Sequence, residues 1–384
     1  MQPLSVLRHG LALMTITTGL CGPVATLHAD EPGDAPETAG TRQGAAPDLR
    51  EDKPPLSVGK GNFVVVPIPF SNPTLDTGLV LGAAWFHAQT EAQKKTQPPS
   101  VTGVAAMGSS NESKAAAVGH MAYWKEDLWR FSGVYAQADL SLPLLAPGDG
   151  GDISNINWII EGGFFQASLA RRVGSRWFLG ATLRYIDLDQ TFEIDLDTNA
   201  FDIGSQVQSA GIGIDLSYDT RDMTTNAREG RYFKATAQFN HENIGSDESY
   251  EAFNINYKQY HLLKDNWGLA WEVAGCSRSD GVPLWDACQI GLRGFAATDY
   301  LGKSSLRAQA ESRWFLSERW GAVAFAGAGQ LTESFAGNRD HDLIPSYGVG
   351  VRFAVQKSNR VNLRLDYARS RDSSAFILSV MEAF

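Results

Sequence analysis

Over most of this 384-residue chain, apolar and polar side chains alternate with a period of two residues. The alternation is clear near the C-terminus, where Val361, Leu363, Leu365 and Tyr367 share one parity and Asn362, Arg364 and Asp366 share the other. Successive side chains of a β-strand point to opposite faces, so a period of two indicates strands rather than helices. Because the pattern recurs from residue 62 to the end, the sequence predicts an all-β domain of two-faced strands.

The polar face of these strands favours a membrane barrel over a soluble one. It carries charged residues in series, such as Arg307, Glu311 and Arg313, which fits a face that lines a hydrated lumen while the apolar face meets lipid. Tryptophans lie near the expected strand ends, as in interfacial aromatic girdles, at Trp124, Trp129, Trp177, Trp267, Trp314 and Trp320. The alternative is a soluble sandwich with one solvated face. We therefore expect a transmembrane antiparallel β-barrel.

The connections between the expected strands alternate in length, which orients the barrel. Short polar links occur at 125–128, 173–176, 264–266, 317–319 and 356–359, and long ones near 139–156, 187–206, 275–304 and 329–344. In outer-membrane barrels, short turns are periplasmic and long loops are extracellular. Counting back from Phe384 predicts about sixteen strands of roughly ten residues each.

The first predicted strand, residues 62–70, is interrupted by Pro67 and Pro69. The link that follows, 89–100, is long for a periplasmic turn. Proline is tolerated at a sheet edge because an edge strand does not use every N–H donor. We therefore expect the first and last strands to be weakly paired where the barrel closes.

The N-terminal 58 residues are predicted to lie outside the barrel. Residues 1–29 resemble an export signal, with Arg8 before a mostly apolar run and the small residue Ala29 at its end. Residues 30–58 contain Pro, Gly and charge with almost no large apolar residue, which predicts a disordered periplasmic leader. The barrel is assigned to residues 59–384, and the location to the bacterial outer membrane.

Composition excludes several classes of function. The net charge of -10 argues against nucleic acid as a partner. The mature chain has no apolar run of the roughly eighteen residues that a membrane helix needs. Its five histidines are scattered, and no hydrolase, metalloprotease or nucleotide-binding motif is present. We expect no enzyme activity and no cofactor.

Two cysteines, Cys276 and Cys288, remain after removal of the export signal. They are close in sequence and belong to an oxidising compartment, so a loop disulfide is plausible, with two free thiols as the alternative. No histidine lies at ligand spacing from the pair, and we predict no metal site.

Three motifs resemble the barrel of the BamA/TamA superfamily, the bacterial surface antigen family. The first is YDTRDMTTNAREGRYF at 218–233, with Asp219, Arg221, Asp222 and Gly230 in the family's turn pattern. Ala227 stands where a proline is common. The resemblance implies a structural role for this turn motif.

The second motif is GLRGF at 291–295, within the long loop after Cys288. In the family, such a tip folds back into the lumen and its arginine pairs with acidic residues of the inner wall. The resemblance therefore assigns Leu292, Arg293, Gly294 and Phe295 to the lumen-loop motif and Glu311 to the inner-wall partner. Gly327 stands where a second carboxylate is frequent in the family, which leaves Glu311 as the main expected anion.

The third motif is the C-terminal alternation of Phe376 and Leu378 toward the terminal Phe384. It is similar to the aromatic signal by which outer-membrane strands are recognised for insertion, a step that adds a strand to an exposed edge. The resemblance thus implies the outer-membrane assembly machinery as a partner for the protein's own insertion, beside the lipid bilayer and its lipopolysaccharide.

The leading hypothesis is a family barrel without the usual periplasmic POTRA domains. It would assist insertion or translocation of a dedicated protein or lipid client through a weak seam between the first and last strands. The alternatives are a passive structural barrel or pore and an outer-membrane lipid hydrolase.

Overall fold

The computed structural model describes residues 56–58, 61–144, 153–196, 200–335, 341–357, 360–371 and 373–384. The predicted export signal and most of the predicted leader lie outside these residues. None of the helices among the described residues is long and apolar enough to cross a membrane.

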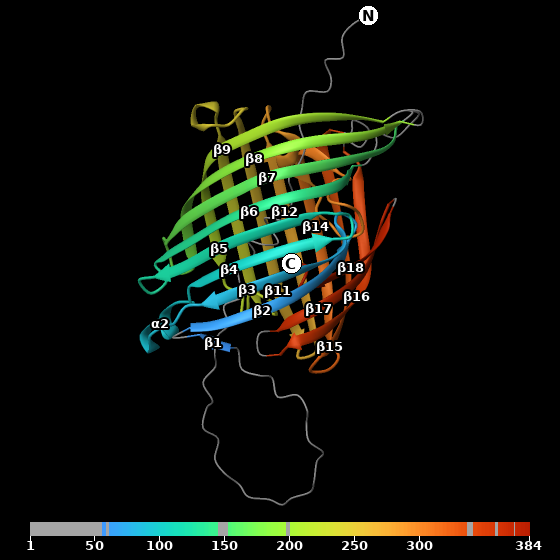
Figure 1. The fold of residues 1–384 in the computed structure, drawn as a ribbon. Helices are drawn as coiled ribbons and strands as arrows, with labels where there is room; N and C mark the ends of the chain where they lie inside the picture. Colours follow the sequence, from blue (N-terminus) through green and yellow to red (C-terminus); the bar gives the residue numbers. More distant parts are fainter. Residues whose placement is uncertain are drawn as a thin grey trace, which may run out of the picture.

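Sixteen long antiparallel strands close into one barrel, as the alternation predicted (Figure 1). The first eight are β2 (Gly61–Asn72), β3 (Asp76–Phe86), β4 (Val101–Ser109), β5 (Lys114–Trp124), β6 (Trp129–Leu144), β7 (Ile153–Arg172), β8 (Trp177–Leu196) and β9 (Ala200–Asp219). The others are β10 (Gly230–Asn240), β11 (Tyr250–Lys264), β12 (Trp267–Arg278), β14 (Leu301–Phe315), β15 (Trp320–Ser334), β16 (Leu343–Gln356), β17 (Val361–Ser370) and β18 (Ser374–Val380). The short strands β1 (Leu56–Val58) and β13 (Cys288–Gln289) extend the sheet locally.

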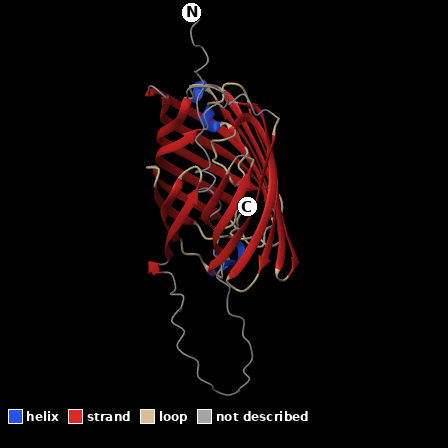
Figure 2. Ribbon diagram, turned by 90° about the vertical axis from the view of Figure 1, so that its right-hand side faces the viewer, coloured by secondary structure: helices blue, strands red, loops and turns tan. Residues whose placement is uncertain are grey.

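The helices among the described residues are short and lie in connections. α2 (Glu91–Thr96) occupies the link after β3, which explains why that link is long for a turn, and its first turn is closed by a capping box at Thr90. η1 (Glu242–Ile244) follows β10, and η2 (Leu284–Asp286) lies in the loop between β12 and β14. Figure 2 shows that loop segments occupy the interior of the barrel.

The barrel wall has apolar residues outside and polar residues inside over the membrane-spanning part. On β14, Leu306 is 60% exposed on the outer face, whereas Glu311 is fully buried on the inner face. On β16, Val349 and Val351 are exposed on the outer face, whereas the next residue, Arg352, is buried on the inner face. This is the polarity expected for a wall between lipid and a polar lumen.

The strands β6 to β9 are longer than predicted, at 16 residues for β6 and 20 for each of the others. The expected long loops near 139–156 and 187–206 are therefore wrong for the most part. The β8–β9 ladder continues as far as Asp195↔Ala200, through the middle of the second expected loop.

The cause of this error is an inversion of polarity along these strands. On β8 the outward side chains change from Leu183 and Tyr185 to Asp187 and Asp189, while the inward ones change from Thr182 and Arg184 to the buried Ile186 and Leu188. Beyond the membrane, water lies outside and packed side chains lie inside, so the two faces exchange character. Because apolar residues move from the outer to the inner face along β8, the alternation changes phase there. This change made residues 187–196 resemble a polar loop in the sequence.

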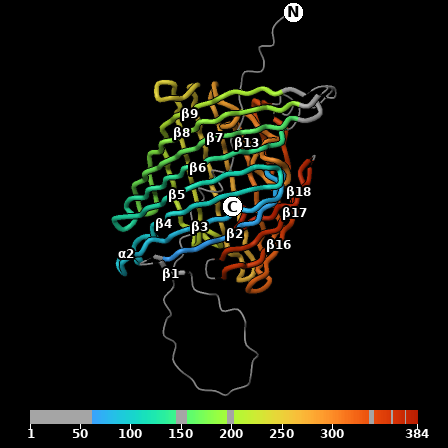
Figure 3. The backbone as a smooth tube through the Cα atoms, viewed as in Figure 1, coloured from blue at the N-terminus to red at the C-terminus, as the bar shows by residue number. Residues whose placement is uncertain are grey.

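The barrel closes between β2 and β18, the blue and the red strand that lie side by side in Figure 3. A single residue pair, Leu378↔Ser71, joins these two strands. Every other pair of neighbouring long strands is joined by at least seven residue pairs. The closure is thus far weaker than the rest of the wall.

Candidate functional site

The loop between β12 and β14 folds into the lumen and places Arg293 among inward-facing carboxylates. Its Nη1 atom lies 2.8 Å from Glu311 Oε2 on β14 and 2.9 Å from Asp366 Oδ2 on β17. Both carboxylates are fully buried, and Arg293 is only 8% exposed. Charge-assisted hydrogen bonds of this kind fix the loop tip at one position on the wall.

Other contacts complete the cradle around the tip. The Arg293 guanidinium stacks 3.3 Å from the centroid of the Phe325 ring, and Ser346 Oγ donates a 2.6 Å hydrogen bond to the Arg293 carbonyl. Gly294 has φ 106°, a backbone conformation that favours glycine, and its carbonyl accepts from Ser373 Oγ at 2.7 Å.

The two apolar residues of the motif are buried together. Leu292 and Phe295 belong to one buried cluster, whose other members are Ile290, Tyr300, Leu331 and Ile344. Packing against the inner wall therefore supports the polar tether on either side of Arg293.

Asp366 was not expected as a partner of Arg293. From the sequence, Glu311 is the main expected anion, because Gly327 stands where a second carboxylate is frequent in the family. A Cβ at Gly327 would lie 2.7 Å from the Cβ of Gln309, so this position has no room for a side chain without a shift. The second carboxylate comes instead from β17, where the alternation already placed Asp366 on the polar face.

The carboxylates are shared with three further arginines. Glu311 Oε1 accepts from Arg313 Nε at 2.8 Å, and Asp366 Oδ1 accepts from Arg352 Nη1 at 2.5 Å. Arg352 Nε also contacts Glu382 at 2.6 Å, and Arg364 Nε lies 3.8 Å from Asp366. The network joins the loop to β14, β16, β17 and the C-terminal segment.

A second anchor holds the same loop closer to its start. Cys276 on β12 and Cys288 on β13 form a disulfide. Asp286 of η2 contacts Arg184 at 2.6 Å and Arg278 at 3.1 Å, and Tyr250 donates to it at 3.0 Å.

Asp286 is charged although it is buried. Burial alone would raise its pKa, but Arg184 and Arg278 outweigh that effect and hold the pKa below its usual value. Neither Asp286 nor its partners stood out in the sequence, because they come from three separate strands and a loop.

The predicted turn motif builds the connection between β9 and β10. Arg221 holds Asp219 through two atoms, at 3.0 Å and 2.7 Å. Asp222 accepts from the backbone N–H of Arg228 and pairs with Arg360 at 2.5 Å. Gly230 has φ 99°, and a Cβ there would lie 2.2 Å from the Thr220 carbonyl. These contacts are those of a closed turn at the periplasmic end.

The C-terminal residues divide into two groups. Phe376 is 66% exposed on the outer face of β18, and Leu378 forms the single pair with Ser71 across the seam. Phe384 does not continue this strand, which corrects the expectation of an alternation running to the terminus. Met381 has φ 71° and turns the chain inward, so that the Phe384 backbone oxygen accepts from Arg313 Nη2 at 2.9 Å.

Comparison with known proteins identifies the fold. A family model described as the Omp85 superfamily domain matches residues 151–374. The structure is similar to BamA from Haemophilus ducreyi lacking POTRA domains 1–3, with a TM-score of 0.57 at 13% identity, over 83% of this chain and 69% of that one.

Two further similar structures carry the name CdiB. That from Acinetobacter baumannii gives a TM-score of 0.55 at 12% identity, over 84% of this chain and 60% of that one. CdiB from Escherichia coli gives a TM-score of 0.59 at 11% identity, over 85% of this chain and 63% of that one. This chain thus spans less than two thirds of either CdiB chain. No curated protein matches it in sequence.

At these identities the solved structures establish the fold alone, whereas the family model covers more than half of the chain. The barrel is an outer-membrane protein, and the chain belongs to the Omp85 superfamily.

Proposed function

We propose that this barrel assists the insertion or translocation of one dedicated protein or lipid client, and that the client engages the seam between β2 and β18. The observation that carries the proposal is the single residue pair across that seam. Unpaired backbone groups at a strand edge are a template for an added strand.

The part of the seam beside the first residues of β2 is left open because β18 ends early. Leu378 lies opposite Ser71, and β18 ends two residues later at Val380. In an antiparallel pair, the residues of β2 before Pro69 therefore have no partner on β18. Among the described strands, only β1 pairs with this part of the edge, at Gly61, Asn62 and Phe63.

The prolines of β2 support the same conclusion. Its ladder with β3 is unbroken from Asn62 to Asn72, through Pro67 and Pro69. N–H groups of alternate residues point to opposite neighbours, so an unbroken ladder requires both missing donors to face the seam. That edge of β2 therefore cannot form a full ladder with β18.

The lumen loop favours a lateral route over passage through the pore. The tether at Arg293 and the anchor at Asp286 hold the loop inside the barrel at two points, and the disulfide joins it to β12. A client that engages the seam does not need to displace either contact.

A disulfide across the seam tests the proposal. Ser71→Cys and Leu378→Cys place thiols on the one directly opposed pair, and oxidation in intact cells would lock the strands together. The unlocked protein should restore normal growth or envelope integrity to a deletion strain. We expect the oxidised, locked protein to fail in this, and reduction of the disulfide to recover it.

The matched control is Ala105→Cys with Ala117→Cys, an opposed pair within the continuous β4–β5 ladder. This second lock should change nothing. If the seam lock forms quantitatively and the protein still restores the phenotype, the lateral route is wrong. No observation in the described residues favours the lipid-hydrolase alternative.

A further inference from the structure

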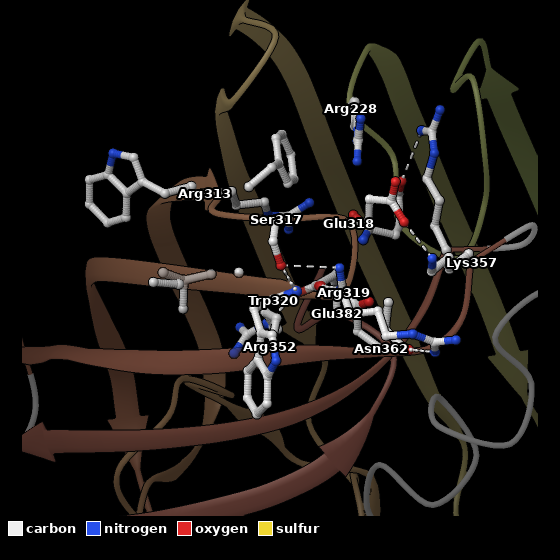
Figure 4. A pocket seen from close by; sticks show the side chains of 18 residues that line it. Arg228, Arg313, Ser317, Glu318, Arg319, Trp320, Arg352, Lys357, Asn362 and Glu382 are labelled. Carbon is white, nitrogen blue, oxygen red and sulfur yellow. Dashed lines mark hydrogen bonds and ion pairs between the residues drawn. The ribbon is translucent and has the colours of Figure 1, made fainter. Parts of the chain in front are cut away.

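A cavity rich in cations lies at the periplasmic mouth of the lumen, where it borders the Arg293 network at Arg313, Arg352 and Glu382 (Figure 4). Its volume is about 80 Å³, and it lies among the β14–β15 turn, the β16–β17 turn and the segment before β10. The ionisable side chains that line it are Arg228, Arg313, Arg319, Arg352, Lys357, Arg360, Glu318 and Glu382. A single water occupies about 30 Å³ of liquid, so the space suits a group of a few heavy atoms.

Four of the six cations are already neutralised by carboxylates. Arg313 pairs with Glu311 at 2.8 Å, and Arg352 pairs with Asp366 and Glu382 at 2.5 Å and 2.6 Å. Lys357 pairs with Glu318 and Arg360 pairs with Asp222, each at 2.5 Å. Both lining carboxylates are used in these pairs.

Arg228 and Arg319 have no carboxylate partner among the described residues. Arg319 Nη1 donates to the Ala354 carbonyl at 3.1 Å. The Arg228 guanidinium lies 4.0 Å from the centroid of the Phe315 ring, and its buried Nε has no hydrogen-bond partner. Burial and the nearby charge of Arg360 lower the pKa of Arg228, as expected for a cation that lacks a counter-charge.

We propose that this cavity binds a phosphate group, held between Arg228 and Arg319. Two guanidinium groups in excess of the local carboxylates match the charge of a phosphate better than that of a single carboxylate, and their planar donors match its oxygens. The group enters from the periplasmic side, either as a free phosphate or on the headgroup of an anionic phospholipid.

Protection from chemical modification tests the site on the unaltered protein. Phenylglyoxal modifies accessible arginines, and mass spectrometry reports the rate at each one. Inorganic phosphate should slow modification of Arg228 and Arg319 about tenfold, which corresponds to occupancy well above half. Arg171, which is exposed on the outer wall, should react at an unchanged rate.

The source of the phosphate is decided by comparing bilayers. Nanodiscs of phosphatidylglycerol and of phosphatidylcholine are used without added phosphate. Protection in phosphatidylglycerol but not in phosphatidylcholine indicates a lipid headgroup, and protection by inorganic phosphate alone indicates a soluble ligand. Equal rates under all of these conditions would overturn the proposal.

Substitution provides an independent measurement. Arg228→Gln with Arg319→Gln should reduce phosphate affinity at least tenfold in a calorimetric or ³¹P titration. Lys94→Gln with Lys95→Gln removes the same charge from exposed α2 and should leave the affinity unchanged. Folding of each variant is checked by heat-modifiable gel migration, and equal losses in both variants would contradict a specific site.

Discussion

At the scale of single residues, the lumen depends on a small number of buried charges that compensate one another. Arg293, Glu311 and Asp366 are all buried, and each contacts a group of opposite charge. Removing one member of such a set leaves the others uncompensated, which costs about 3–5 kcal/mol for a buried pair.

Arg293→Ala should therefore free the loop tip and open the lumen. We expect the variant to conduct more in planar bilayers than the unaltered barrel and to unfold at a lower temperature, by an amount that reflects a loss of about 3–5 kcal/mol. Arg293→Lys keeps the charge but loses the planar stack on Phe325. Its conductance and unfolding temperature should lie between those of Arg293→Ala and those of the unaltered barrel. An unchanged conductance in Arg293→Ala would show that the tether does not close the pore.

Asp286 makes the second anchor dependent on pH. Its pKa is lowered in the folded protein, so its contribution is present above the unfolded value of about 3.9 and is lost as pH falls through the folded value. Proteolysis of the loop should therefore increase on acidification below about pH 4. The loop of Asp286→Asn should be cleaved readily at neutral pH, and the cleavage rate should change little on acidification. If cleavage of this variant rises with acid as steeply as in the unaltered protein, Asp286 does not anchor the loop.

At the scale of elements, the long strands β6 to β9 and the short pairing of β18 with β2 divide the wall into strong and weak parts. The positions of the strands could be predicted from the sequence because lipid and lumen impose opposite preferences on alternate residues. The strand ends could not, since the pattern on β8 changes phase where Ile186 and Leu188 face inward.

The inversion on β8 locates the outer boundary of the membrane. A cysteine at Asp189 should react in intact cells with a membrane-impermeant maleimide, while one at Leu183, on the same outer face, should not. Cys276 and Cys288 form a disulfide and do not compete for the reagent. Equal labelling at both positions would place the boundary elsewhere.

The seam should be the least protected part of the wall. Backbone amides of Gly61–Asn72 and Ser374–Val380 are expected to exchange with deuterium faster than those of Trp177–Leu196, because few of them are held by a neighbour across the closure. Mass spectrometry of peptic fragments measures this, and slow exchange along both edge strands would contradict a weak closure.

At the scale of the whole molecule, the barrel combines a rigid wall, a loop anchored in its lumen and one weak closure. The strands of the wall could be predicted from the alternation of apolar and polar residues, and the loop tip at Arg293 from a recognisable motif. It did not reveal Asp366 or Asp286 as partners, because a partner across a barrel is set by strand register and curvature rather than by spacing along the chain. Arg228 and Arg319 likewise line one cavity only after the turns of the periplasmic mouth have closed.

The unequal strand lengths also shape what the protein presents to the outside of the cell. β7, β8 and β9 have 20 residues each, whereas β2 has 12 and β18 has 7. The rim is therefore uneven, tall over β7 to β9 and low where β2 and β18 meet (Figure 1). A client that left between β2 and β18 would emerge on the low side of the rim, where the long hairpins of β7 to β9 do not cover it.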